Sequence, residues 1–104
     1  MTEVLICGRW RLRDDKQETE LIDLMRNAMI PHYQKYGNRV KLGLLRIADT
    51  RSYLVLQRWP DRKDWAEFPT SLFYERWLAE YEPILEQWDA LVELEDEWEC
   101  EELL

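Results

Sequence analysis

The sequence predicts an α+β fold in which four antiparallel strands form one sheet and two helices cover one of its faces. Four segments alternate apolar and polar side chains with the period of two that is typical of strands. Two segments with helical spacing separate the first strand from the second and the third from the fourth. The 104 residues suffice for one domain, so we expect a single domain over residues 1–104.

The first strand is predicted from Val4 to Arg13. A helix should follow, because Asp15 and Glu18 resemble a capping box. Pro31 should kink or restart this helix, since its ring blocks the hydrogen bond to residue 27. Its apolar side chains recur at helical spacing: Leu21, Ile22, Met25, Ala28, Met29 and Tyr33. Gly37-Asn38 is expected to end the helix in the left-handed conformation.

The second and third strands are predicted from Val40 to Ala48 and from Tyr53 to Trp59, joined by a hairpin connection of residues 49–52. Pro60 cannot donate to a ladder, so pairing should stop before it. Asp61 should then cap a short helical segment around Trp65, because its carboxylate can accept from free N–H groups.

Pro69 should interrupt this segment, and Thr70-Ser71 should cap a longer helix. Its apolar stripe is Phe73, Trp77, Tyr81, Ile84 or Leu85, and Trp88. Pro83 falls within the stripe and is expected to start a separate last turn. The fourth strand is predicted from Ala90 to Trp98.

The predicted order is β-α-β-β-α-β, the ferredoxin-like arrangement, in which the first and last strands are antiparallel neighbours. A regular register predicts cross-strand charge pairs between Arg9, Arg11 and Arg13 and Glu93, Glu95 and Glu97. The same register points Cys7 and Cys100 to opposite faces, so we expect no bond between them.

The middle strands carry large apolar side chains on both faces, although two helices can cover only one face. Burying each such side chain contributes roughly 1.5–3 kcal/mol. A second copy of the sheet, packed face to face, would cover the remaining patch. The sequence therefore predicts a two-fold homodimer through the sheet face.

The net charge of −8 comes entirely from residues 89–104, because residues 1–88 hold fourteen acidic and fourteen basic side chains. An acidic end repels phosphate groups, which argues against nucleic acid and anionic membranes as partners. The acidic side chains of the last strand and tail are expected to be solvated and to keep the protein soluble. The alternative is that they form a docking site for a basic partner. The sequence contains no run of about 18 apolar residues, so it predicts no membrane-spanning segment.

The two cysteines lack metal-ligand spacing and the chain has a single histidine, so we expect no metal site. The first residues lack the pattern of a signal peptide. A reduced, cytoplasmic protein is therefore expected.

A family resemblance is carried by three stretches: residues 37–49, residues 53–61, and Trp65 together with residues 72–78. They resemble the antibiotic biosynthesis monooxygenase domain of the dimeric α+β barrel superfamily. The most distinctive feature is a tryptophan that ends the third strand, matched by Trp59. The resemblance implies a homodimer and cofactor-independent oxygenation of a small apolar aromatic compound, whose carbanion reacts directly with dioxygen.

In this family the strand-ending tryptophan is proposed to donate to the developing oxyanion, so the resemblance implies a catalytic role for Trp59. An asparagine four residues earlier is typical of the family; this chain has Val55 there. The haem-degrading branch needs an asparagine on the first strand and a histidine on the second long helix. This chain has neither, and Phe68 stands where many relatives have a histidine, which disfavours haem cleavage.

Several residues are candidates for a substrate pocket between sheet and helices: Tyr53, Gln57, Trp59, His32, Tyr36, Trp65, Phe73 and Trp77. Each has a structural alternative. Trp59 and the other aromatic residues could be core, and Gln57 could bond to neighbouring backbone. His32 could accept a proton in the pocket, or be an exposed or helix-terminal residue.

Two hypotheses about function remain from the sequence. The chain is either a small oxygenase acting on an apolar aromatic compound, or a non-catalytic dimer that binds a small ligand or serves in assembly. A pocket in which Gln57, Trp59 and a tyrosine hydroxyl converge would favour the enzyme. A pocket filled by the chain's own aromatic rings would favour the second hypothesis.

Overall fold

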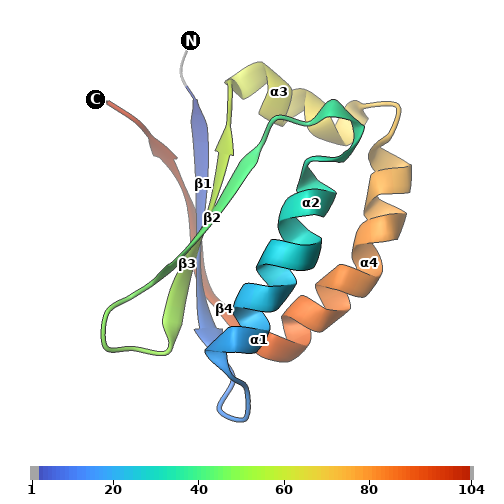
Figure 1. The fold of residues 1–104 in the computed structure, drawn as a ribbon. Helices are drawn as coiled ribbons and strands as arrows, with labels where there is room; N and C mark the ends of the chain where they lie inside the picture. The colour runs from blue at the N-terminus through green and yellow to red at the C-terminus, as the bar shows by residue number, and fades with distance from the viewer. Residues whose placement is uncertain (1–2, 104) are drawn as a thin grey trace.

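A computed structural model describes residues 3–103 and contains one four-stranded antiparallel sheet with helices on one face (Figure 1). The strands are β1 (Val4–Leu12), β2 (Lys41–Arg46), β3 (Ser52–Trp59) and β4 (Val92–Glu101), in the spatial order β2-β3-β1-β4. The predicted ferredoxin-like fold is confirmed, including the pairing of the first and last strands. No helix among the described residues is long and apolar enough to cross a membrane.

The first helical region continues through Pro31 without a break. It consists of α1 (Glu18–Leu24), a π-helical turn (Met25–Met29) and α2 (Ile30–Tyr33). In the π turn the N–H of Ile30 bonds to the carbonyl of Met25, five residues back. This wider turn accommodates the proline ring without the α-helical bond that the ring would block. The predicted kink or restart is thus replaced by a local widening.

Both ends of this region differ from the prediction in detail. The carboxylate of Glu20 accepts from the N–H of Gln17 at 2.8 Å, so the helix begins at Glu18 and the predicted cap at Asp15 is wrong. At the other end, Tyr36 and Gly37 adopt φ of 60° and 80°. Gly37 is left-handed as predicted, whereas Asn38 is extended.

After β3, the chain turns at Pro60 as predicted and enters α3 (Arg62–Glu67). The carboxylate of Asp61 accepts from the N–H of Asp64 at 2.8 Å, which confirms the predicted cap. A 3₁₀ turn (Phe68–Thr70) follows.

The longest helix, α4 (Tyr74–Leu91), corrects two predictions. It begins after Phe73 without a side-chain cap, so Thr70-Ser71 does not cap it. It also continues through Pro83, which is exposed. The ring therefore lies on the solvent side of the helix, and burial of the opposite face compensates for one lost hydrogen bond.

The core lies between the covered face of the sheet and the helices. Leu21 and Met25 pack there against Leu12 of β1 and Val55 of β3. Trp88 of α4 is 2% exposed, and its ring meets that of Trp10 edge-on, with centroids 5.2 Å apart. The buried residues of α4 are Trp77, Tyr81, Trp88 and Leu91, whereas Phe73 is 49% exposed and leaves the predicted stripe.

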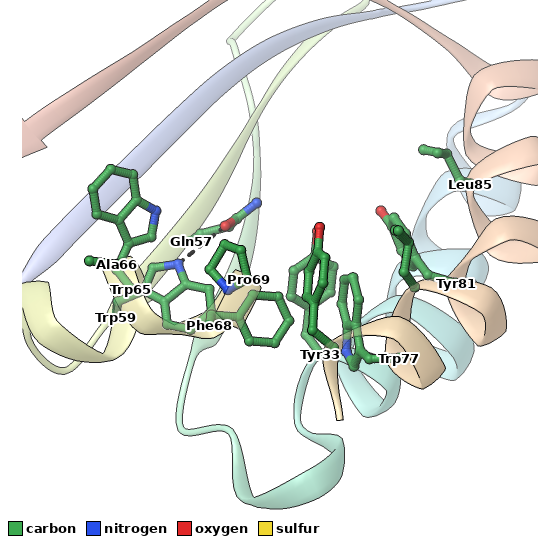
Figure 2. Close-up of a pocket in the computed structure, with 12 residues that line it drawn as sticks. Tyr33, Gln57, Trp59, Trp65, Ala66, Phe68, Pro69, Trp77, Tyr81 and Leu85 are labelled. Atoms are coloured by element: carbon green, nitrogen blue, oxygen red, sulfur yellow. Dashed lines mark hydrogen bonds between the residues drawn. The ribbon is translucent and has the colours of Figure 1, made fainter. Parts of the chain in front are cut away.

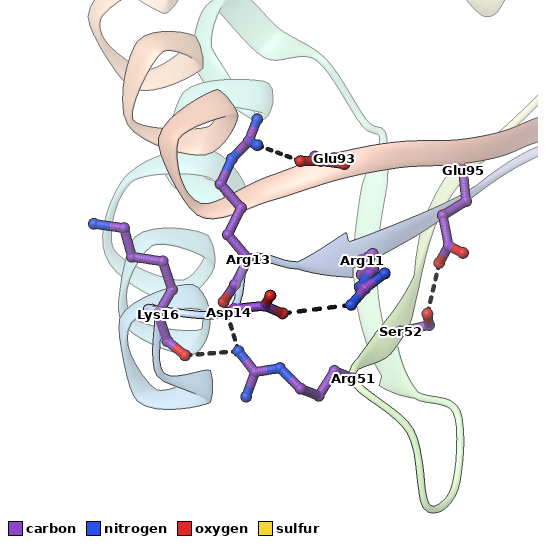
Figure 3. A network of polar contacts seen from close by, with 8 residues as sticks. All are labelled: Arg11, Arg13, Asp14, Lys16, Arg51, Ser52, Glu93 and Glu95. Atoms are coloured by element: carbon purple, nitrogen blue, oxygen red, sulfur yellow. Dashed lines mark hydrogen bonds and ion pairs between the residues drawn. The ribbon is translucent and has the colours of Figure 1, made fainter.

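A bulge in β4 changes the predicted register. Arg11 lies opposite Glu93, but Arg9 lies opposite Asp96, because Glu95 is the extra residue. One of the predicted charge pairs forms: the guanidinium of Arg13 lies 2.5 Å from the carboxylate of Glu93 (Figure 3). The carboxylate of Glu95 instead accepts a hydrogen bond from the hydroxyl of Ser52.

Beyond the bulge, the side chains of β4 change faces relative to the prediction. Cys7 pairs with Trp98 and Leu5 pairs with Cys100, so both cysteines lie on the open face of the sheet. Their sulfur atoms are 3.8 Å apart. The prediction that they point to opposite faces is therefore wrong, and the physical reason is the single inserted residue.

Arginines of the chain balance part of the acidic charge of β4 and the tail. Arg58 contacts Glu3 at 2.6 Å and Glu102 at 2.7 Å, and Arg62 pairs with Glu99. These pairs are partly exposed, so each contributes little to stability.

Replacing the buried indole in Trp88→Ala should lower the free energy of unfolding by about 3–5 kcal/mol, because it leaves a cavity against Trp10. Urea denaturation measures this change as a lower midpoint at an unchanged slope. Leu85→Ala, on the more exposed side of the same helix, is the control and should cost less than about 1.5 kcal/mol. Equal losses in the two variants would contradict the described packing of α4.

Candidate functional site

A cavity of about 450 Å³ lies between the end of β3, the segment of α3 and its following turn, and helix α4 (Figure 2). Gln57 and Trp59 line it from the sheet, and Trp77 and Tyr81 line it from α4. Leu78 and Leu85 also line it and are 40% and 37% exposed, so the cavity reaches solvent along α4.

The local sequence explains where this cavity forms. Alternation along β3 places Val55, Gln57 and Trp59 on the covered face of the sheet. Pro60 then ends the strand, and the capped turn of α3 brings Trp65 and Phe68 beside the end of β3. The ring centroids of Trp59 and Phe68 are 5.3 Å apart.

A few polar groups occur among the mainly apolar side chains of the cavity, including those of Gln57, Trp59, Tyr33 and Tyr81. The indole N–H of Trp59 donates to the side-chain oxygen of Gln57 at 3.3 Å. This bond leaves the amide NH₂ of Gln57 as a free donor beside the cavity (Figure 2). Tyr33 and Tyr81 contribute two hydroxyls from the opposite wall, with their ring centroids 5.5 Å apart.

Both tyrosines are neutral over the physiological pH range. Burial raises the pKa of Tyr33, and the neighbouring Tyr81 raises it further. Burial also raises the pKa of Tyr81. The residues that line the cavity include no Asp, Glu, His, Lys, Arg or Cys. The wall can therefore donate hydrogen bonds, but it holds no group that could take up a proton near neutral pH.

Trp77 holds the inner wall of the cavity in place through His32. The indole N–H of Trp77 donates to the carbonyl of His32 at 3.0 Å, and Nε2 of His32 donates to the carbonyl of Trp77 at 2.9 Å. The imidazole also stacks on Tyr81, with centroids 5.4 Å apart. These two reciprocal bonds join α2 to α4 directly behind the cavity.

His32 is 2% exposed, so the expectation of an exposed residue is wrong, although it does lie in the last turn of α2. Burial lowers the pKa of its imidazole, which is therefore neutral at pH 7. Its Nδ1 has no partner among the described residues. The side chain supports the wall and does not line the cavity.

The structure brings together four of the eight predicted pocket residues: Gln57, Trp59, Trp65 and Trp77. Tyr53 lies at the other end of β3, where its hydroxyl donates to Glu18 at 2.8 Å and lowers the pKa of that carboxylate. Tyr36 stacks on Phe73 and bonds to Glu80 outside the cavity. Whether any of the four lining residues binds a ligand stays a prediction.

The most informative residues that the prediction omitted are Tyr33, Phe68 and Tyr81. The sequence places both tyrosines in helical stripes of core residues, and periodicity does not indicate which ring of a stripe borders a void. Phe68 follows Trp65 by three residues, a helical spacing that does indicate a shared side. That spacing is the one signal in the sequence that could have found it.

No group of three or more His, Cys, Asp or Glu side chains within residues 3–103 is arranged to hold a metal ion. The residues that line the cavity offer hydrogen-bond donors inside a mainly apolar enclosure.

No protein-family model matches this chain, and no curated protein matches it either. Solved structures do match. SnoaB, a cofactor-independent oxygenase from Streptomyces nogalater, aligns over 96% of this chain and 92% of its own, with 17% identity and a TM-score of 0.65. HapK from Hahella chejuensis aligns over the same shares, 96% and 92%, with 14% identity and a TM-score of 0.68.

A nipsnap family protein of unknown function from Agrobacterium tumefaciens aligns over 97% of this chain and 87% of its own, with 14% identity and a TM-score of 0.65. These similarities confirm the predicted resemblance at the level of the fold. At such identities they do not extend to an activity.

The buried neutral His32 predicts a specific dependence of stability on pH. Because its pKa is lower in the folded chain, the unfolded chain binds the proton more readily below about pH 6.5. Stability should therefore fall as pH decreases from about 7.5 to 5.5, by at most about 1.4 kcal/mol per pH unit from this group.

His32→Gln keeps a donor toward the carbonyl of Trp77 and removes the titration. The difference in unfolding free energy between wild type and variant isolates His32, because the carboxylates titrate in both. Parallel pH curves for the two proteins would refute the assignment of a neutral, buried imidazole.

Proposed function

We propose that this chain is a cofactor-independent monooxygenase that oxidises a small, apolar aromatic compound in the cavity between β3 and α4. The observation that carries the proposal is the convergence of Gln57, Trp59, Tyr33 and Tyr81 on one apolar cavity of about 450 Å³. This volume is within the range of small-molecule sites. The fold shared with a cofactor-independent oxygenase supports the same reading.

The proposed substrate is acidic enough to lose a proton to solvent, because no lining residue can serve as a base. An anthrone or a quinol has this property. The amide NH₂ of Gln57, oriented by the indole of Trp59, donates to the oxygen on which the negative charge collects. Gln57 thus supplies the polar partner of Trp59 from the same strand face as Val55, where the family has asparagine.

The substrate carbanion gives its electrons to dioxygen and forms a peroxide. Loss of water from the peroxide leaves a carbonyl group on the substrate, so one oxygen atom enters the product and the other leaves as water. The hydroxyls of Tyr33 and Tyr81 can donate to the peroxide, since both remain protonated. The apolar walls favour entry of dioxygen, and the open side along α4 lets the proton of the substrate reach solvent.

Turnover of anthrone-like and quinol substrates, followed with an oxygen electrode, tests this proposal. Uptake should persist with a metal chelator, and Trp59→Phe should lower kcat by about 10²-fold, because it removes the group that orients the donor. Leu72→Ala, at a side chain that is 96% exposed, is the control and should retain full activity.

Across a substrate series, kcat/KM should rise with pH in step with the pKa of each substrate. A single apparent pKa shared by all substrates would reveal a base on the protein and refute the mechanism.

The second candidate is a non-catalytic module that binds a small apolar ligand. It is favoured by the missing base and by the indole N–H of Trp59, which already has a partner. Ligand-dependent quenching of tryptophan fluorescence without oxygen uptake would support it. Leu78→Trp should weaken such binding by filling the open side of the cavity, while Leu72→Trp should leave it unchanged.

We also propose that the chain forms a two-fold dimer through the open face of its sheet. Apolar side chains occupy the centre of this face: Leu5, Leu54, Leu56 and Trp98 are half-buried and Leu45 is 52% exposed. No described helix covers them. A two-fold axis would bring the same apolar surface of a second copy against them.

Light scattering after size exclusion should give twice the chain mass. Leu56→Asp should shift the protein toward monomer, because Leu56 lies opposite both Cys7 and Gly43 at the centre of the face. Leu72→Asp adds the same charge elsewhere and should keep the dimer. A wild-type monomer at micromolar concentration would contradict the proposal.

A further inference from the structure

Two thiols that are far apart in the chain meet on the open face of the sheet. Cys7 of β1 and Cys100 of β4 are 93 positions apart in sequence, and their sulfur atoms are 3.8 Å apart. Both are free thiols. Neither belongs to the cavity of the proposed oxygenase, so this pair is independent of that function.

We infer that Cys7 and Cys100 are a redox-active thiol pair, which a small-molecule disulfide converts reversibly into an intramolecular disulfide bond. The bulge at Glu95 creates the pair, because without it Cys100 would point to the other face. The two residues are diagonal neighbours across the β1–β4 ladder, since Cys7 lies opposite Trp98 and Cys100 lies opposite Leu5.

Closing the bond requires only a modest movement. A disulfide has a sulfur–sulfur distance of about 2.0 Å, so the sulfurs must approach by a further ~1.8 Å. Diagonal neighbours are ~7–8 Å apart, against ~4.5–5.5 Å for directly opposed residues, so side-chain rotation must be joined by a shift of the backbone. β4 can make this shift, because it is an edge strand that pairs only with β1.

The two sulfurs have different environments, which assigns their roles. Cys7 is 5% exposed, and burial together with the neighbouring Cys100 raises the pKa of its thiol to about 11. Cys7 is therefore protonated near neutral pH and a poor first nucleophile. Cys100 is half-buried and lies near the end of the edge strand β4, away from Leu56 at the centre of the face that the proposed dimer would cover, so it is the sulfur that a reagent can reach first.

The reaction proceeds by two exchanges. The thiolate of Cys100 attacks one sulfur of the small disulfide, which forms a mixed disulfide and releases one small thiol. Cys7 then gives up its proton and attacks the sulfur of Cys100, which releases the second small thiol. The protein loses two hydrogens and the small disulfide gains them, so the exchange balances.

The bond would join the first strand to the last, toward the end of the sheet where β1 begins and β4 ends (Figure 1). It would close a loop that includes almost the whole chain, the case in which a disulfide restricts the unfolded state most. The oxidised chain should therefore be more stable than the reduced chain.

Oxidised glutathione at pH 8, followed by trypsin digestion and mass spectrometry, tests the inference. Trypsin cuts after Arg9 and Arg76, and no lysine or arginine follows Arg76. A disulfide between the two cysteines joins peptide 1–9 to peptide 77–104, with loss of two hydrogens. We expect this pair in the folded protein, its disappearance with dithiothreitol, and a thermal midpoint that rises by several degrees on oxidation.

Two variants serve as controls. Cys7→Ser should keep Cys100 reactive and give a single glutathione adduct, without a rise in the thermal midpoint. Cys100→Ser should give little or no adduct, because Cys7 is buried and protonated. Two glutathione adducts on wild type, no reaction at all, or a linked pair found only in a covalent dimer under denaturing, non-reducing conditions would overturn the inference. None of these results bears on the oxygenase proposal, because neither cysteine lines the cavity.

Discussion

The two ends of α4 pack against different partners, and this difference produces the cavity. Toward its C-terminal end, Trp88 packs on Trp10 of the sheet, with centroids 5.2 Å apart. Toward its N-terminal end, Trp77 is bonded in both directions to His32 of α2. The helix is thus held by the sheet at one end and by the neighbouring helix at the other, which leaves space above Gln57 and Trp59.

The polar groups of the cavity are few, and their placement follows from strand geometry. Alternation along β3 puts Gln57 and Trp59 on one face, two residues apart, where an amide and an indole can bond. A bonded indole is less available to a substrate, but it fixes the orientation of the amide that remains free. The lining therefore suits a substrate that brings its own acidity, because the walls offer donors and no base.

The open face of the sheet combines the apolar surface expected of an interface with the pair of cysteines. Both features depend on which side chains β1 and β4 present there. The bulge at Glu95 determines which side chains face outward from Asp96 to the end of β4, because one inserted residue moves every later side chain to the opposite face. The same insertion explains why the ladder of charge pairs expected between β1 and β4 forms only at Arg13 and Glu93.

Local chemistry in the sequence determined the fold class, the order of the elements, the end of β3 at Pro60 and the cap at Asp61. Each of these depends on a backbone property of one residue or on a short period of apolar side chains. The sequence also predicted Gln57, Trp59, Trp65 and Trp77 near one another, because they belong to the covered strand face and to the helices above it.

Only the tertiary structure decided the position of Phe73, the burial of His32, the face of Cys100 and the continuity of the helices through Pro31 and Pro83. Burial of a helix face can outweigh one lost hydrogen bond, and a single bulge reverses the alternation of a strand. Neither effect is encoded in a local period. Both depend on contacts between residues that are far apart in the chain, and these contacts also separate the aromatic rings that fill the core from those that line a cavity.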